Sequence, residues 1–320
     1  MKITWRTSLV ALVATALCGA AVAQDKVRAA VGQRGNWDTL VISQGVEAGF
    51  FKRAGLEVEI TWTRGGAETM QALITGSADL NIANGILGAI GAISKGAPVK
   101  IVSAQFTGAS DLYWYAKTDS PVKGMKDMGG HTMGYSRPGA SSQLVAAALA
   151  AHAGVKPNLI SAGGIPDNRT QVMSGQIDAG WAVPPFNFDL LNEGKIRVIA
   201  RGSDVPALAD QTVRVNLASQ KFLTEKRDVA RRFMKAYADT IDWMYANPGD
   251  AAAFFAKFND LSVEIAKQTA PSFPKAAVAP WPVQGLKKNL DEALEHKQLD
   301  KPLAESDAQK MLFDFVYQPK

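Results

Sequence analysis

The 320-residue sequence contains one cysteine, Cys18, and only three histidines. A single cysteine cannot form a disulfide within the chain, so the fold must be stabilised by packing. The histidines, His131, His152 and His296, are scattered, and no two have the spacing of metal ligands. The sequence also lacks a Gly-x-Ser-x-Gly nucleophile motif and a phosphate-binding loop. These absences argue against metal-dependent and covalent catalysis, and nothing in the sequence calls for a cofactor.

Long runs of one charge sign are also missing. The formal net charge is +5, but acidic and basic residues are interspersed and no basic run reaches five residues. A nucleic-acid partner is therefore not expected. After residue 23, no apolar stretch approaches the roughly 20 residues that a membrane-spanning helix needs. The length suffices for two ordinary domains, each with a hydrophobic core.

The first 23 residues have the three parts of a secretory signal peptide. Lys2 and Arg6 supply the charged region, Leu9 to Leu17 the apolar region, and Ala21 to Ala23 a small-residue cleavage site. Leu17 stands where lipid-attachment signals usually have a small residue, so we expect cleavage after Ala23 rather than a lipid anchor on Cys18. This cleavage would remove Cys18 and leave a soluble, exported chain without cysteine, which fits a bacterial periplasm.

Two segments that lie 99 residues apart share one pattern. Ala-Gly-Leu at 54–56 recurs as Ala-Gly-Val at 153–155, and Thr-Gly-Ser-Ala-Asp at 75–79 recurs as Ser-Gly-Gln-Ile-Asp at 174–178. Each copy has the signature of helix, glycine cap, strand, helix, glycine cap and strand. The sequence therefore predicts two similar lobes. The repeated aspartates, Asp79 and Asp178, begin strands, and we expect them to accept hydrogen bonds from backbone N–H groups.

Strands alternate with helices over the first two thirds of the chain, which predicts an α/β fold with mostly parallel sheets. The segment after residue 225 predicts helices. We expect the chain to cross between lobes near 112–120 and 207–216, which would form a hinge of two segments. Lobe I then comprises 24–116 and 210–320, and lobe II comprises 117–209. The predicted strands are 27–32, 56–63, 79–83, 100–106, 112–117, 132–135, 159–162, 177–182, 196–200 and 213–218, and one helix is predicted from Asp38 or Thr39 to Gly55.

Four short motifs give the sequence a family resemblance. They are Trp-Asp-Thr-Leu at 37–40, Gly-Phe-Phe-Lys at 49–52, Gly-Ser-Ala-Asp at 76–79 and Pro-Gly-Ala-Ser-Ser at 138–142. With them, the chain resembles the solute-binding proteins of ABC importers for nitrate, taurine and aliphatic sulfonates. The resemblance implies a type II periplasmic binding fold, with two doubly wound lobes joined by a two-segment hinge and a helical C-terminal region.

The same resemblance implies a function. The protein would bind a small-molecule solute in the periplasm and deliver it to the membrane permease subunits of an ABC importer, and we expect it to be a monomer. The segment 181–185 departs from the family pattern, because no acidic residue precedes its prolines. That departure argues against a primary amine on the ligand.

Ligands of open α/β sheets lie where strands end and helices begin. The loop 136–142 is the best candidate, because Ser136 and Ser141 offer hydroxyls while Gly139 and Ala140 precede a helix with free N–H groups. Such a loop suits a carboxylate, sulfonate or nitrate. The same residues are also typical of an ordinary helix N-cap.

Three arginines stand in loops of this kind. A guanidinium can hold an oxyanion through two hydrogen bonds, although a loop arginine is more commonly solvated. We expect one of Arg34, Arg64 and Arg137 to contact the ligand. Arg64 is favoured because Gly65 and Gly66 would let the ligand approach.

The remaining candidates are two tryptophans and two asparagines. By the repeat, Trp37 occupies the place of residue 136 in the other copy, which favours a role in the pocket over core packing. For Trp181, pocket and core remain equal alternatives. Asn36 belongs to the same loop as Trp37. Asn84 ends a strand, where it either binds ligand or forms an Asn-Gly turn.

The sequence favours a binding protein for a small organic anion or heterocycle over two alternatives. One is an enzyme on the same fold that makes pyrimidine or quinone precursors. The other is a sensor lobe that serves a membrane receptor. Neither ligand identity nor the choice between transport and sensing follows from the residues, because one fold supports many sites.

Overall fold

A computed structural model describes residues 24–319 of the chain. The predicted signal peptide, residues 1–23, lies outside the described residues. Within 24–319 no helix has both the length and the apolar character needed to span a membrane.

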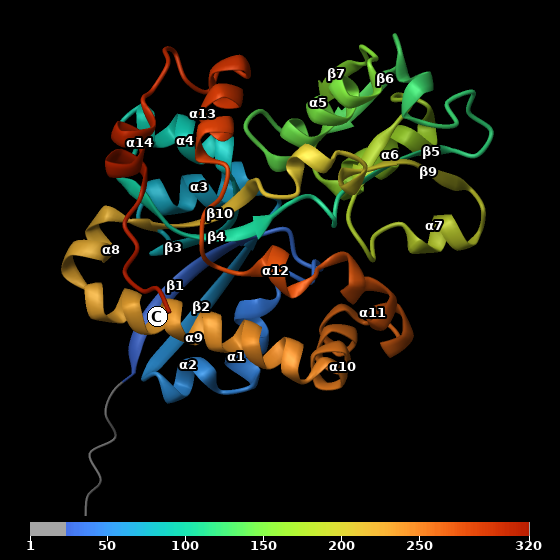
Figure 1. Ribbon diagram of the computed structural model, residues 1–320. Coiled ribbons are helices and arrows are strands. Elements are labelled where there is room, and N and C mark those ends of the chain that lie inside the picture. The colour runs from blue at the N-terminus through green and yellow to red at the C-terminus, as the bar shows by residue number, and fades with distance from the viewer. Residues whose placement is uncertain (1–23, 320) are drawn as a thin grey trace, which may run out of the picture.

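The first lobe is built on a five-stranded sheet in the order β2-β1-β3-β10-β4 (Figure 1). The apolar strand β1 is parallel to both of its neighbours, whereas β10 returns antiparallel between β3 and β4. At the sheet edge, the first six residues of β2 alternate between buried or partly buried and exposed positions, as in a half-covered strand. The strands are β1 (Asp25–Gly32), β2 (Leu56–Thr63), β3 (Leu80–Gly85), β4 (Val99–Thr107) and β10 (Thr212–Ser219), and the helices between them are α1 (Val41–Glu47), α2 (Phe50–Arg53), α3 (Gly66–Ile74) and α4 (Ile86–Ser94).

The second lobe repeats this plan. A three-stranded sheet, β8-β5-β9, is linked to the parallel pair β6-β7 by a bridge between Met133 and Ala179. The resulting order, β7-β6-β8-β5-β9, corresponds strand for strand to that of the first lobe. The elements are β5 (Tyr113–Lys117), β6 (Thr132–Tyr135), β7 (Asn158–Ser161), β8 (Gly180–Ala182), β9 (Ile196–Arg201), α5 (Ser141–Ala153), α6 (Ile165–Ser174) and α7 (Phe188–Asn192), with short 3-10 helices at η1 (Met125–Met128), η2 (Gly202–Asp204) and η3 (Pro206–Leu208).

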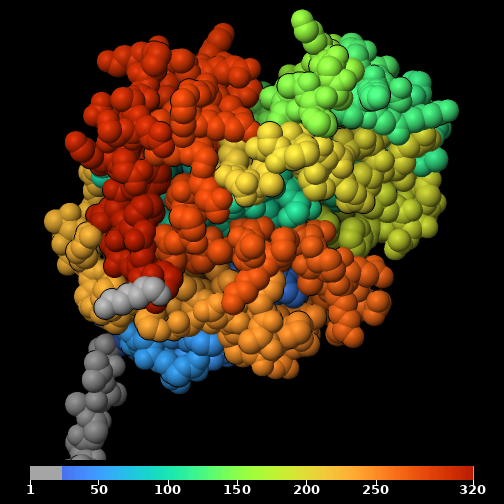
Figure 2. All heavy atoms as spheres, in the orientation of Figure 1, coloured from blue at the N-terminus to red at the C-terminus, as the bar shows by residue number. Residues whose placement is uncertain are grey.

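The C-terminal region is helical, as predicted, and it covers the first lobe. In Figure 2 these orange and red segments lie beside the green residues of the second lobe. The long helix α9 is amphipathic and packs its apolar face against α1 and α2. The elements are α8 (Gln220–Glu225), α9 (Arg227–Ala246), α10 (Pro248–Asn259), α11 (Val263–Thr269), η4 (Ala270–Ser272), α12 (Lys275–Val278), α13 (Leu286–Glu295) and α14 (Glu305–Leu312).

The internal repeat has the predicted structural basis. Gly55 and Gly154, and likewise Gly76 and Gly175, adopt left-handed backbone with φ between 68° and 78°. Asp79 accepts a hydrogen bond from the N–H of Arg28 at 2.9 Å, and Asp178 accepts one from Thr132 at 2.8 Å. Each aspartate thus ties the start of one strand to its parallel neighbour. The predicted fold class is confirmed.

Two details differ from the sequence predictions. The strand β5 pairs with β8 and β9, so residues 113–116 lie in the second sheet and not in lobe I; the chain crosses at 108–112. The helix predicted from 38 or 39 to 55 is broken at Gly49, whose φ of 76° is left-handed. Asp38 does not cap that helix, because its carboxylate is turned toward Arg214.

Candidate ligand-binding site

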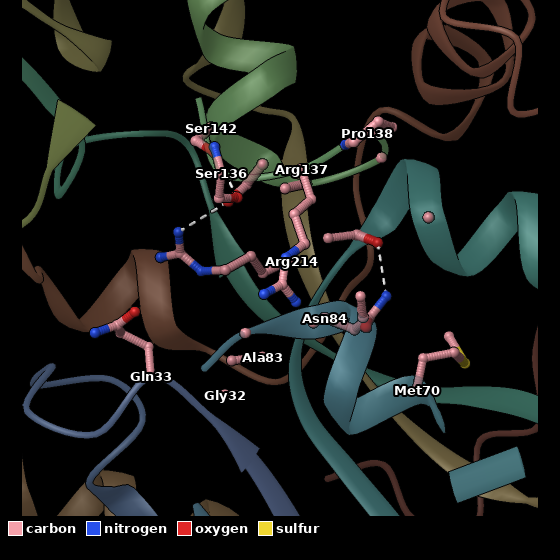
Figure 3. Close-up of a pocket in the computed structure, with 18 of the residues that line it drawn as sticks. Gly32, Gln33, Met70, Ala83, Asn84, Ser136, Arg137, Pro138, Ser142 and Arg214 are labelled. Atoms are coloured by element: carbon pink, nitrogen blue, oxygen red, sulfur yellow. Dashed lines mark hydrogen bonds between the residues drawn. The ribbon is translucent and has the colours of Figure 1, made fainter. Parts of the chain in front are cut away.

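A cavity of about 390 Å³ lies between the two lobes. Figure 3 shows Ser136 and Arg137 reaching it from the second lobe, opposite Gln33 and Asn84 of the first. Its walls include residues at or just after the ends of strands: 32–33, 36, 38–39, 64–67 and 83–85 in the first lobe, and 136–142 in the second. This is the edge of the sheets at which the sequence predicted a ligand site.

Four helices begin at this cavity, two from each lobe. Their N-cap residues, Gly65 of α3, Gly85 of α4, Ala140 of α5 and Gly164 of α6, all line it. None of the four has a side chain that can cap its helix. The positive ends of four helix dipoles therefore converge on one space, which favours negative charge there. In α4 one first-turn N–H, that of Gly88, already donates to the Gly139 carbonyl at 3.0 Å.

Arg214 lies at the inner wall and is almost fully buried. Its guanidinium donates to Asp111 at 2.6 Å, to Asp38 at 3.3 Å and to Gln105 at 3.0 Å, and it lies over the ring of Phe106. Burial raises the pKa of Asp111 to about 6, although the guanidinium acts in the opposite direction. These contacts fix Arg214, which also donates a 3.4 Å hydrogen bond to the hydroxyl of Ser141 in the second lobe.

A second group of charged side chains lies nearer the surface and connects the two lobes. Glu68 accepts a 2.9 Å bond from Arg64 and lies 3.7 Å from Arg137, which comes from the other lobe. A backbone N–H bond from Arg64, together with both guanidinium groups, holds the pKa of Glu68 below its usual range. The Arg64 side chain is 82% exposed, whereas that of Arg137 is 33% exposed. Arg137 is thus the more enclosed of the two cations.

The structure brings most of the candidate residues together. Those that line the cavity are Asn36, Arg64, Gly65, Gly66, Asn84, Ser136, Arg137, Gly139, Ala140, Ser141 and Trp181. The indole of Trp181 donates to the Gly163 carbonyl, and the amide of Asn84 donates to the Gly85 carbonyl. Both side chains are therefore held in place by backbone acceptors.

Two candidates lie elsewhere. The prediction for Trp37 is wrong: the residue is 2% exposed and packs against Phe255 of α10, with ring centroids 5.2 Å apart. Arg34 stacks over Phe258 and donates to its carbonyl, away from the cavity. Both side chains therefore pack against α10.

Several cavity residues were missed from the sequence. The sequence did indicate a special role for Arg214, because an arginine between Val213 and Val215 in a buried strand requires a charged or polar partner. Asp38 was interpreted as a helix cap. Lys95 and Gln298 also line the cavity, and no local pattern marks them. Within residues 24–319, no group of three or more His, Cys, Asp or Glu side chains is placed to hold a metal ion.

Comparison with known proteins identifies the family. The NMT1/THI5-like family model matches residues 36–251, more than half of the chain. The chain belongs to the NMT1/THI5-like family. None of the curated proteins compared with this family member has a significantly similar sequence.

Solved structures agree on the fold of this NMT1/THI5-like chain. The alkanesulfonate-binding protein SsuA of Xanthomonas axonopodis pv. citri, bound to MOPS, gives a TM-score of 0.77 at 18% identity and covers 91% of this chain and 99% of its own. The periplasmic aliphatic sulphonate-binding protein SsuA of Escherichia coli gives 0.70 at 19%, covering 92% of both chains. The desulfurization enzyme DSZB gives 0.64 at 16%, covering 92% and 98%. At such identities the likeness shows the fold, which is that of periplasmic binding proteins.

Proposed function

We propose that this protein is the periplasmic solute-binding component of an ABC importer. It captures a small organic anion between its lobes, with a sulfonate or an aromatic carboxylate as the main candidates, and delivers it to the membrane permease subunits. We further propose that it acts as a monomer, exported through its first 23 residues.

The observation that carries this proposal is the convergence of four helix N-termini on one cavity. Each N-terminus favours an adjacent anion by roughly 0.3–1 kcal/mol when exposed, and by more when partly buried. The lining also contains four basic side chains, Arg64, Lys95, Arg137 and Arg214, against one acidic side chain, Asp38. The helix N-termini and the basic side chains both favour negative charge, so the cavity is suited to an anion.

The size and position of the cavity support capture by lobe closure. About 390 Å³ falls within the range of small-molecule pockets. Residues of both lobes form the walls, and the lobes already contact each other through Arg137 and Glu68. A ligand that binds groups of both lobes stabilises the closed form over the open form.

The comparisons support the same class of function. Two of the similar structures are, by their names, sulfonate-binding proteins, and one is described as periplasmic. The sequence resemblance to importer components points in the same direction. The printed names concern those proteins, so the anion bound here is part of the proposal.

The test is a thermal-shift and calorimetric screen of the purified protein against sulfonates, nitrate, aromatic carboxylates and pyrimidines. A ligand present at 100 times its dissociation constant adds about 2.7 kcal/mol to the free energy of unfolding, which raises the Tm visibly. We expect organic anions to raise the Tm, and the Arg137→Gln variant to bind them at least tenfold more weakly. An exposed arginine outside the cavity, Arg231, provides the matched control variant Arg231→Gln. If no anion binds, the proposal fails.

A second candidate function is catalysis, because DSZB shares the fold. Of the described residues that line the cavity, none is a cysteine or a histidine. A cysteine nucleophile and a histidine base are therefore lacking at the cavity wall, which favours binding. Incubation with biphenyl-2-sulfinic acid, the compound named in a DSZB complex, followed by an assay for loss of the sulfur group would test this alternative.

A further inference from the structure

The cavity extends well beyond the space at the four helix N-termini. Besides the residues at the strand ends, its lining includes Gly88, Gly91 and Ala92 of α4 and the C-cap residue of that helix, Lys95. These four recur at the three- and four-residue spacing of one helix face. Because a helix rises about 1.5 Å per residue, the N-cap residue Gly85 and Lys95 lie roughly 15 Å apart. The cavity therefore follows α4 from one end to the other.

A second helix contributes to the wall of this extension. Met70 and Gln71 of α3 line the cavity as well. Figure 3 shows Met70 on the opposite side of the cavity from Gln33. Between the helix N-termini and Lys95, the wall thus presents a thioether, the methyl group of Ala92 and glycine backbone. Such a wall suits an apolar ligand body.

The small residues of α4 leave room for the Lys95 side chain. In a helix the Cα–Cβ bond tilts toward the N-terminus, so a side chain lies over the preceding turn. For Lys95 that turn contains Gly91 and Ala92. Gln298 fills the space over Gly91, where an added Cβ would lie 2.9 Å from its Oε1, and the side of Ala92 remains. The lysine stem can therefore lie along α4 with its ammonium group toward the cavity.

The outer end of the cavity is cationic. Among the described residues that line the cavity, the single acidic one is Asp38, and it lies at the inner wall beside Arg214. Lys95 belongs to none of the ion pairs that residues 24–319 form. The amides of Gln71 and Gln298 add possible N–H donors to the lining. A cation that no carboxylate of the protein neutralises suits an anionic group of the ligand.

We propose that the ligand is an elongated dianion, with one anionic group at each end of an apolar body. One sulfonate or carboxylate group lies against the helix N-termini and Arg137, and the second binds Lys95. This inference rests on the proposed function and specifies the ligand class further. Lys95 and Ala92 are then specificity residues, because Lys95 recognises the second charge and Ala92 leaves room for the body.

The separation of the two charges, and not only their number, then determines selection. A monoanion of the same length makes the contacts at the helix N-termini but leaves Lys95 in water. A short dianion brings its second charge near the first and does not reach Lys95. An elongated dianion makes both sets of contacts at once.

The experiment compares matched anions by isothermal titration calorimetry on the purified protein, at one fixed ionic strength because salt screens exposed charges. The pairs are hexanedioate with hexanoate and 4-sulfobenzoate with benzenesulfonate. We expect the dianion of at least one pair to bind five or more times more tightly than its partner. The isomer 2-sulfobenzoate, with the same charge at a shorter separation, should bind no more tightly than benzenesulfonate.

Three outcomes would contradict these expectations. If monoanions bind as tightly as their dianion partners, the inference is overturned while the proposed function stands. If 2-sulfobenzoate gains as much as 4-sulfobenzoate, total charge and not a two-ended site explains the preference, and the inference is overturned as well. If none of these anions binds and the wider screen is also negative, the proposed function fails together with the inference.

Variants test the two specificity residues. Lys95→Gln removes the charge at an exposed position and should bring the members of each pair to within about twofold of each other. Ala92→Leu fills the extension and should weaken binding of 4-sulfobenzoate at least tenfold, while methanesulfonate binds as it does to the wild type. Lys267→Gln and Ala253→Leu, at exposed positions of α11 and α10 outside the cavity, are the matched controls.

The variants also give results that would overturn the inference. A full preference for dianions in Lys95→Gln would mean that Lys95 does not bind the second anionic group. Equal losses of 4-sulfobenzoate and methanesulfonate affinity in folded Ala92→Leu, with a Tm close to that of the wild type, would mean that the extension does not hold the ligand body.

Discussion

The backbone N–H of Gly88 in the first lobe donates a hydrogen bond to the carbonyl oxygen of Gly139 in the second, at 3.0 Å. Gly88 lies in the first turn of α4, so a carbonyl of one lobe satisfies a helix N–H of the other. The approach is too close for side chains: a Cβ on Gly85 would lie 2.5 Å from that carbonyl oxygen, and one on Gly139 would lie 2.8 Å from the Cα of Gly88. Glycine at these positions lets the two backbones meet beside the cavity.

The first prediction concerns this contact. Gly85→Ala inserts a methyl group between the lobes, so we expect it to hinder closure and to weaken ligand binding by about tenfold or more. Small-angle scattering of the ligand-bound variant should also give a larger radius of gyration than that of the wild type. Gly249→Ala, where an added Cβ meets nothing within 4 Å, is the control. Unchanged affinity in Gly85→Ala would mean that the contact is not needed for closure.

The second prediction concerns the buried charge cluster. Among residues 24–319, Arg214 is the only cation that contacts both Asp38 and Asp111, so Arg214→Met leaves two carboxylates buried without it. Breaking a buried pair in this way typically costs about 3–5 kcal/mol of unfolding free energy. Urea unfolding monitored by circular dichroism measures the loss. The double variant Arg214→Met, Asp111→Asn should recover part of it, and no recovery would contradict the charge explanation.

The third prediction concerns the acid stability that Asp178 provides. Burial by itself raises the pKa of this carboxyl, but hydrogen bonds from Thr132 and His131 outweigh burial and hold the pKa below its usual range. A lowered folded-state pKa contributes stability that is present above about pH 4 and is lost as the pH falls further. The wild type should therefore exceed Asp178→Asn in unfolding free energy at pH 7. We expect the difference to shrink at pH 3, and a difference that is constant with pH would contradict this assignment.

The fourth prediction separates core from cavity. Trp37→Ala removes a buried ring that packs against Phe255, and large-to-small substitutions of this kind typically cost about 3–5 kcal/mol. Trp37→Phe keeps an aromatic ring in the core, so it should bind ligand like the wild type. Calorimetric titration of the folded Trp37→Phe variant measures this. A tenfold loss of affinity in that variant would place the indole in the ligand contact after all.

Much of the fold follows from local sequence. The glycines at 55, 76, 154 and 175 end helices in left-handed backbone, which few other residues adopt, and their spacing alone predicts two lobes. The loop 136–142 was recognisable as a site for the same kind of reason, because strand ends and helix starts are local features. Arg34 was not separable from Arg64 and Arg137, because all three stand in similar loops. Tertiary contacts distinguish them: Arg34 lies against Phe258, 224 residues away, whereas Arg64 and Arg137 approach Glu68.

The sequence by itself determined the two-lobed plan, the cap glycines and the strand-end loops, since each depends on residues within one or two turns of chain. The tertiary structure decided which side chains meet. Asp38 has the sequence of a helix cap but binds Arg214, 176 residues away, because β10 returns between β3 and β4 and brings the guanidinium to it. Trp37 enters the core because α10 covers it. The strand β5 belongs to the second lobe because its hydrogen-bonding partners, β8 and β9, lie there. Backbone hydrogen bonds and buried ion pairs are formed between distant segments, and no local pattern specifies their partners.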